Sequence, residues 1–261
     1  MQAIFDYEVE NGIPHGYIGF AISRASPSGA WQKLERSEIG VDEAFFRAFK
    51  SDLKDASVWK EFHDLRIQVP SEKDSANFSA PGSTIVTEPP SLPPVPDVEA
   101  EELFWAMMAA STRPDPYVSV ALHKVRASGH FVLAALSNTI ILPDNDPRST
   151  NLTEANKQLW DLFDLVISSA NVRMRKPEPR IYHYTMQRLQ EIVGSDLTSN
   201  QIIFLDDIGE NLKAAKAAGM RTIKVWLGKT QQAVQELQDI IDMDLLDSSI
   251  STSKRSETAK L

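Results

Sequence analysis

The sequence contains no cysteine among its 261 residues. This absence excludes disulfide cross-links, thiolate zinc sites and a cysteine nucleophile. It is compatible with a reducing intracellular compartment, where disulfides are rare. Any chemistry in the chain must therefore come from carboxylates, hydroxyls, amides and amines.

Long apolar runs are also missing. No stretch of 18 apolar residues occurs, so the sequence predicts no membrane-spanning helix. Residues 1–8 have neither the basic start nor the apolar centre of a secretory signal peptide. These two absences argue against a membrane partner.

Basic residues are outnumbered, with 27 Lys and Arg against 36 Asp and Glu, for a formal charge of −9. Such a chain repels phosphate backbones, so we expect no nucleic-acid partner. A site for a small anion would have to be locally basic. The 42% hydrophobic and 24% charged residues are ordinary for a globular protein, and the length allows a core with a smaller cap.

The N-terminal part reads as helical and is interrupted by a proline-rich stretch. Residues 1–68 show helical spacing of apolar residues, and Asp42-Glu43 suits a helix start. Residues 70–97 are rich in Ser and Pro, which favours a mobile loop. Another helix is expected over 98–110. We predict a helical cap region over residues 1–115.

From residue 116 onward, short apolar strands alternate with helices. Strands are expected at 131–136, 165–168, 202–205 and 222–226, with helices between them. Gly129 is placed to end the first of these helices. This alternation predicts an α/β core over 116–246, built as a three-layer parallel sheet with helices on both faces. The polar residues 247–261 are expected to be a disordered tail.

Polar residues follow three of these strands, where parallel sheets bind ligands. Ser137-Asn138-Thr139 follows the first strand, and its hydroxyl and amide groups could bind phosphate oxygens or simply cap a turn. Lys176 precedes a helix that Pro179 could open. Its ammonium could neutralise a phosphoryl group, or it could be a solvated loop lysine.

The third cluster is Asp206-Asp207, with Asn211 four residues further on. Two adjacent carboxylates at the end of a buried strand are costly unless they are paired or bind a metal. Their oxygens suit Mg²⁺, and the alternative is an acidic helix cap. A receiver domain uses similar parts, but its acidic pair comes first in the chain.

The order Ser-Asn, Lys, Asp-Asp resembles the second, third and fourth motifs of the haloacid dehalogenase superfamily. The matching segments are 136–139, 176–182 and 203–212, and the run to residue 220 is similar to the phosphatase domain of soluble epoxide hydrolases and of acyl-CoA dehydrogenase fusion proteins. Residues 32–39 resemble that family's helical cap. The resemblance covers about 10–68 and 98–245.

The resemblance implies a magnesium-dependent phosphatase that acts on a small phosphorylated substrate through an aspartyl-phosphate. Ser137 and Asn138 would then bind the phosphoryl oxygens, and Lys176 would balance charge. Asp207 would be the main Mg²⁺ ligand, with Asp206 beside it and Asn211 in support. In this family, residues of the cap select the substrate, and oligomeric state is not implied.

The family's first motif, a hydrophobic strand ending in Asp-x-Asp ahead of the cap, has no counterpart. Asp6 and Glu8 have the right spacing, but their surroundings continue as a helix, so we assign no nucleophile. We therefore expect an N-terminally truncated chain that is inactive as given, in which the loss of a central strand leaves ladder hydrogen bonds unmade. The alternative is a catalytically dead binding or regulatory protein with the same fold.

The chain ends in Ala259-Lys260-Leu261, after a polar stretch. This tripeptide resembles the Ser-Lys-Leu type of peroxisomal address, although three residues also match by chance. The sequence therefore leaves cytoplasmic and peroxisomal locations open.

Overall fold

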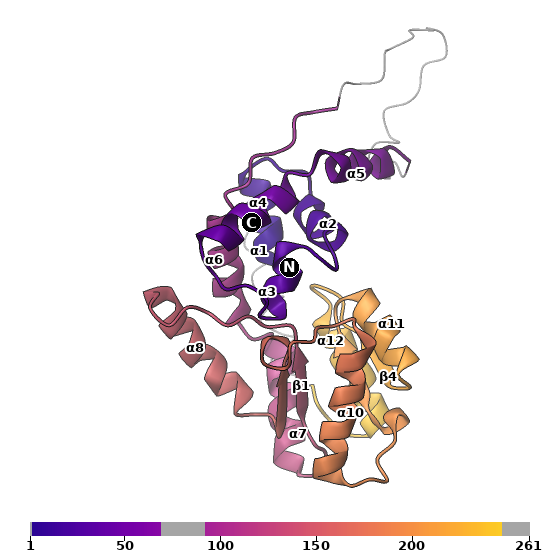
Figure 1. Ribbon diagram of the computed structural model, residues 1–261. Helices are drawn as coiled ribbons and strands as arrows, with labels where there is room; N and C mark the ends of the chain where they lie inside the picture. The colour runs from indigo at the N-terminus through magenta and orange to yellow at the C-terminus, as the bar shows by residue number, and fades with distance from the viewer. Residues whose placement is uncertain (1, 69–91, 247–261) are drawn as a thin grey trace, which may run out of the picture. The chain divides into compact units, whose positions relative to one another are not determined.

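The computed structural model describes residues 2–68 and 92–246, and these separate into two compact units (Figure 1). The first unit comprises residues 1–33 and 41–110, and the second comprises residues 34–40 and 111–261. The short segment 34–40 thus belongs to the second unit although it lies between two parts of the first. No helix in the described ranges is long and apolar enough to cross a membrane.

The first unit is all helical, as the spacing of its apolar residues predicts. Asp42 begins the fourth helix by accepting a hydrogen bond from the Phe45 amide at 2.8 Å. The core is aromatic, and Phe45, Phe49 and Phe104 are almost wholly buried there. The helices are α1 (Gln2–Glu10), α2 (Tyr17–Arg24), α3 (Ala30–Glu35, which runs into the second unit), α4 (Glu43–Leu53), α5 (Ala56–Gln68) and α6 (Ala100–Ser111).

Glu8 of α1 is a buried carboxylate that connects α1 to the start of α2. Its carboxylate accepts hydrogen bonds from the backbone amides of Gly16 at 2.7 Å and Ile18 at 2.8 Å. These amides belong to the free N–H groups at the start of α2, which a carboxylate stabilises. The acidic pair Asp6 and Glu8 therefore lies in a helix, as its flanking residues indicate.

The second unit alternates helices with short parallel strands. Asp115 begins α7, and Gly129 ends it with φ of 65°, as its position in the sequence predicts. Pro179 stands in the first turn of α10. The elements are α7 (Pro116–Ser128), β1 (Ala134–Ser137), α8 (Pro147–Trp160), β2 (Leu165–Ser168), α9 (Ser169–Val172), α10 (Pro179–Val193), η2 (Ser199–Gln201), β3 (Ile203–Asp206), α11 (Gly209–Ala217), β4 (Arg221–Lys224) and α12 (Thr230–Ile241).

The four strands form two parallel pairs instead of one sheet. β1 pairs with β2, so that Ser137 lies opposite Ser168, and β3 pairs with β4, so that Asp206 lies opposite Lys224. In the described part of the chain, β1 and β3 have no ladder between them. We expected ladder hydrogen bonds to be unmade beside an absent central strand, and the described strands have no ladder between β1 and β3.

Helices cover both faces of the strand pairs. Leu136 of β1, Ile167 of β2 and Phe204 of β3 share one apolar cluster with Ile181 and Tyr182 of α10. A second cluster joins α7 and α12 with Leu133, the residue just before β1. The predicted α/β class with parallel strands is confirmed.

Strand ends differ most from the prediction. The apolar run 131–136 predicts a strand from residue 131, but β1 begins at Ala134, and Phe131 and Val132 are each 41% exposed. The proline-rich stretch is irregular over 92–99, as expected, while 69–91 and the tail 247–261 with its terminal tripeptide lie outside the described residues.

Candidate active site

Lys176 is the centre of the candidate site. It follows α9 and precedes α10, and its ammonium donates a hydrogen bond to Asp206 Oδ2 at 2.6 Å. Both side chains are largely buried, with 11% and 4% of their surface exposed. The lysine nitrogen also lies 5.4 Å from the centre of the Phe204 ring. This ion pair joins the loop before α10 to the carboxyl end of β3.

Asn138 holds the main chain of Lys176. Its side-chain oxygen accepts a hydrogen bond from the Lys176 amide at 2.8 Å, and its side-chain nitrogen donates to the Lys176 carbonyl at 3.0 Å. Both hydrogen-bonding groups of the asparagine amide are thus engaged by one residue. Asn138 follows β1, so this pair of bonds ties the end of β1 to Lys176, and through it to β3.

Asp206 is satisfied by three donors. Besides Lys176, its other carboxylate oxygen accepts from the Ile208 amide at 2.8 Å and from Asn211 Nδ2 at 3.0 Å. A buried carboxylate is tolerated when it is paired and hydrogen-bonded in this way. Burial, with the nearby Asp206 carboxylate second, raises the pKa of Tyr182, whose hydroxyl donates to the Asn211 carbonyl. The phenol is therefore neutral at physiological pH.

Asp207 has a different environment from its neighbour. It is exposed, and its backbone carbonyl accepts a hydrogen bond from Lys224 Nζ. Ile208 is the N-cap residue of α11 and provides no side-chain hydrogen bond there. Neither aspartate is thus the cap residue of this helix, which was the alternative interpretation of the pair.

Hydroxyl groups gather beside Ser137 at the carboxyl ends of β1 and β2. Thr139 Oγ1 and Ser168 Oγ are 2.5 Å apart, and Ser169 Oγ accepts from the Thr139 amide at 2.9 Å. Ser169 Oγ also donates to the Glu35 carbonyl at 2.7 Å. The cluster therefore attaches the segment 34–40 to the sheet edge.

Charged residues that the sequence motifs did not single out support the Lys176 loop. Arg175 Nε donates to Glu35 Oε2 at 2.6 Å, with both side chains nearly buried. Arg36 lies 2.6 Å from Glu38 and 3.6 Å from Glu178. Arg175 could have been predicted as a site residue because it directly precedes Lys176. Its partner Glu35 could not, because it lies 140 residues away in the chain.

The structure thus brings Asn138, Lys176, Asp206 and Asn211 into one bonded network that joins β1 to β3. Ser137 is the last residue of β1, and Asp207 follows β3 at the same edge. Among the described residues no group of three His, Asp or Glu side chains is arranged to hold a metal ion. The network thus contains one ammonium paired with one buried carboxylate, next to the hydroxyl cluster and the exposed Asp207.

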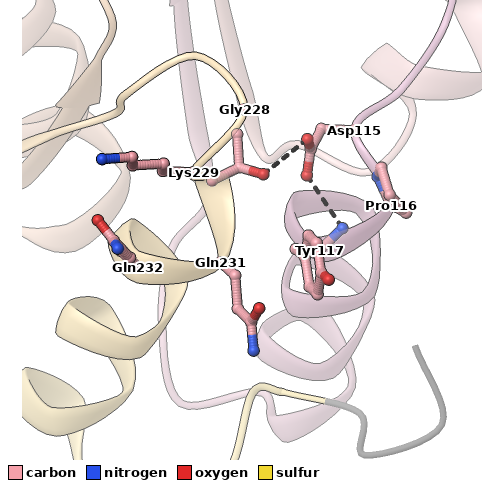
Figure 2. A pocket seen from close by; sticks show the side chains of 8 residues that line it. Asp115, Pro116, Tyr117, Gly228, Lys229, Gln231 and Gln232 are labelled. Atoms are coloured by element: carbon pink, nitrogen blue, oxygen red, sulfur yellow. Dashed lines mark hydrogen bonds between the residues drawn. The ribbon is translucent and has the colours of Figure 1, made fainter. Parts of the chain in front are cut away.

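A separate pocket of about 320 Å³ lies between the starts of α7 and α12 (Figure 2). Asp115 stands between these helices, where its carboxylate accepts from the Tyr117 amide at 3.0 Å and from the Thr230 hydroxyl at 2.8 Å. The pocket is lined by Asp115, Pro116, Tyr117, Gly228, Lys229, Thr230, Gln231 and Gln232. It includes none of the residues of the Lys176 network.

Comparison with known proteins matches residues 140–225 to the haloacid dehalogenase-like hydrolase family. The chain is 28% identical over 241 residues to acyl-CoA dehydrogenase family member 10 of Mus musculus. The matched residues make up 92% of this chain and 17% of that protein. It is 33% identical over 139 residues to bifunctional epoxide hydrolase 2 of Mus musculus, covering 53% of this chain and 23% of that protein.

A third relative is phosphatase MT3486 of Mycobacterium tuberculosis, with 40% identity over 125 residues, 48% of this chain and 52% of that protein. The chain therefore spans less than a quarter of the two mouse relatives and about half of the bacterial one.

Proposed function

Since the chain is a haloacid dehalogenase-like hydrolase, we propose that the Lys176 network is the phosphoryl-binding half of a phosphatase site. The observation that supports this most directly is the ion pair of Lys176 with Asp206, held where β1 and β3 end. The Lys176 ammonium, which is paired with Asp206 here, is the cation at this edge that a phosphate ester would bind. The substrate class is accordingly a small phosphorylated molecule.

Each residue of the network has a distinct proposed role. Lys176 balances the charge of the phosphoryl group, and the Ser137 hydroxyl donates to a phosphoryl oxygen. Asn138 has both amide groups on the Lys176 main chain, so it acts by positioning the lysine. Direct binding of phosphate by Asn138, as the resemblance implies, would require these two bonds to break.

The residues present do not complete a magnesium site. The Asp206 carboxylate is occupied by Lys176, Ile208 and Asn211, which leaves Asp207 as the exposed carboxylate at this edge. Mg²⁺ binds through one or two carboxylates together with water and substrate phosphates. We propose that Asp207 is one such ligand, with Asp206 and Asn211 setting the turn that carries it, and that water and the substrate phosphate provide further ligands.

The nucleophile is the missing part of this proposal. Asp6 and Glu8 lie in α1, and Glu8 is committed to the start of α2. We therefore propose that residues 1–261 alone have no phosphatase turnover and correspond to a shortened form of an enzyme that acts through an aspartyl-phosphate. A binding or regulatory protein that has lost catalysis is the alternative.

Phosphate binding and turnover can be measured separately. Inorganic phosphate should raise the Tm of the chain, and Lys176→Met should abolish that shift, while Lys213→Met, which removes an exposed lysine of α11, should leave it intact. Equal shifts in the two variants would refute the proposed site. Hydrolysis of an aryl phosphate with Mg²⁺ that Asp207→Asn abolishes would refute the proposed inactivity.

The terminal tripeptide Ala259-Lys260-Leu261 is proposed as a peroxisomal address. A fluorescent protein fused ahead of the full chain should collect in peroxisomes, and removal of the three residues should leave it diffuse. The same distribution for both fusions would show that the tripeptide is an ordinary tail.

A further inference from the structure

Residues 92–97 form a proline-rich segment of the first unit that belongs to no helix or strand and leads toward α6 as an extended trace (Figure 1). Its residues are Leu92, Pro93, Pro94, Val95, Pro96 and Asp97. Proline fixes φ at about −65° and holds the residue before it in the extended region, so every residue of the segment except the aspartate favours the polyproline II conformation. The segment is therefore stiff and loses little conformational entropy when a partner binds it.

Helices of the first unit hold this segment in place. The indole nitrogen of Trp59, in α5, donates a hydrogen bond to the Pro93 carbonyl at 2.7 Å. Asp97 pairs with the Lys54 ammonium at 3.0 Å, and the next residue, Val98, is fully buried. The segment is thus attached at two points along its length and keeps a defined position on the unit.

The start of the segment is exposed although it is apolar. Leu92 has 46% of its surface exposed, and Pro93 and Pro94 are exposed as well. Val95 and Pro96 are half-buried, so the open surface narrows toward the point where the chain enters the unit. A stiff apolar ridge that stays open to solvent is suited to recognition by another protein.

The spacing of the residues defines the kind of groove that fits. A polyproline II helix has about three residues per turn, so residues at positions i and i+3 lie on one ridge. Leu92 and Val95 therefore share one ridge, and Pro93 and Pro96 share the next. The result is two pairs of an aliphatic residue followed by proline, one turn apart. Grooves lined by aromatic side chains bind segments with this Pro-x-x-Pro spacing.

The contact with Trp59 uses the same chemistry inside the chain. Its indole N–H donates to a carbonyl of the segment, and its ring also contacts the rings of Tyr17 and His63. Trp59 itself is only 2% exposed, so this indole is committed to its own segment. An aromatic groove of a partner would instead meet the side that remains open, which begins at Leu92.

We propose that residues 92–96 are a docking site for a protein domain of the SH3 type, whose aromatic-lined groove binds polyproline II segments. The pairs Leu92-Pro93 and Val95-Pro96 occupy two neighbouring pockets of the groove, and Pro94 spans them. Residues 92–99 contain no Lys or Arg, so apolar contacts and hydrogen bonds to the main chain carry the recognition. This contact is independent of the proposed phosphatase site.

The test uses the full chain and a panel of purified SH3 domains in NMR titrations. At least one domain should show saturable shifts confined to its aromatic groove, including the indole N–H signal. Pro93→Ala should weaken this binding at least about tenfold, because it removes one of the two pairs. Pro94→Ala keeps both pairs, so this matched control should weaken binding less than about threefold. Leu92→Ala removes the most exposed apolar side chain of the segment without changing a proline, and it should also weaken binding more than Pro94→Ala does.

Several results would overturn the proposal. These are absence of binding across the panel, and equal losses in Pro93→Ala and Pro94→Ala. The synthetic peptide acetyl-Leu-Pro-Pro-Val-Pro-Asp-amide should displace the full chain from the domain. Binding that this peptide does not displace would assign the contact to another part of the chain. Binding of the peptide but not of the full chain would show that the contacts with Trp59 and Lys54 close the segment to partners.

Discussion

The helices of the first unit and the strands β1 and β3 of the second unit bury their apolar residues to different extents. In the helical first unit Phe49, Leu53, Leu103 and Phe104 have no exposed surface. In the second unit Ile181 and Tyr182 of α10 are equally buried, whereas Phe204 of β3, which packs against them, is only partly buried. Helices satisfy their backbone internally, so a helical unit closes around its side chains, whereas a strand with an open edge stays half covered. The helices of both units thus contain fully buried side chains, and β1 and β3 are the less covered elements of the second unit.

The largest test of this comparison is a matched pair of phenylalanine truncations. Phe104→Ala should lower the free energy of unfolding by about 3–5 kcal/mol, because it removes a fully buried ring. Phe204→Ala should cost about 2 kcal/mol, because its ring is only partly covered. Urea unfolding followed by circular dichroism would measure both. Equal losses of unfolding free energy in the two variants would show that Phe204 in β3 is as well packed as Phe104 in the helical core.

The next test concerns the buried ion pair of the second unit. Lys176→Met should destabilise the protein by about 3 kcal/mol, because it leaves the Asp206 charge buried without its cation. Lys60→Met, which breaks the exposed pair with Asp64 in the first unit, should change stability by less than about 0.5 kcal/mol. The double variant Lys176→Met with Asp206→Asn should regain part of the loss. A Lys176→Met variant as stable as the wild type would mean that the pair is solvated.

Asn138→Ala should have a smaller effect, about 1–2 kcal/mol, because it leaves the half-buried amide and carbonyl of Lys176 without the side chain that binds them. Hydrogen exchange should show faster exchange at the Lys176 amide, with no change in the first unit. Asn138→Asp keeps the oxygen that accepts from this amide and should retain slow exchange there. Slow exchange of the Lys176 amide in the alanine variant would contradict the positioning role of Asn138.

Asp115 caps α7 and also binds Thr230 of α12. Asp115→Ala should lower the Tm, mainly because α7 loses its cap. The expected cost is about 1 kcal/mol in the free energy of unfolding. Thr230→Val removes only the bond between the helices and should cost less. Differential scanning calorimetry would separate the two. A larger loss for Thr230→Val would show that the link, and not the cap, is the stabilising contact.

The smallest expected effect is a pH dependence of stability that comes from Asp164, whose carboxylate binds the backbone just before β1. The Leu133 amide, and secondarily Arg126, holds the pKa of Asp164 below its usual value of 3.8. A carboxyl with a lowered folded pKa stabilises the protein above its unfolded pKa, and this contribution disappears as the pH falls through the folded value. Asp164→Asn should therefore cost more stability at pH 7 than at pH 2.5. A cost that does not change between these two pH values would contradict the lowered pKa.

Much of the fold follows from local patterns in the sequence. The apolar run 165–168 becomes β2 without change, and Pro179 and Gly129 mark the helix ends they were expected to mark. The strand at 131–136 is shorter than predicted, because an apolar run shows the tendency to form a strand but not whether a partner is present. Pairing is a tertiary property, so the break between β1 and β3 could be expected only from the missing motif.

The sequence predicted which residues lie near the candidate site, but not which hydrogen bonds they make there. The predicted strands 131–136 and 202–205 indicated that Ser137, Lys176 and Asp207 would lie at one edge of the sheet, and the structure pairs Lys176 with Asp206. The engagement of Asn138 with the Lys176 backbone depends on the path of a loop, which the spacing of residues does not define. The Arg175–Glu35 pair joins residues too far apart in the chain for any local pattern to show.

The segment 34–40 affects how this protein can be divided. It is connected at both ends to the first unit, yet Glu35 binds Arg175 and Ser169, and the Ser37 hydroxyl donates to the Ala170 carbonyl. A recombinant fragment starting at residue 111 would leave out these partners just beside Lys176. Any minimal version of the α/β unit must therefore include this heptapeptide, for example grafted ahead of α7 by a flexible linker.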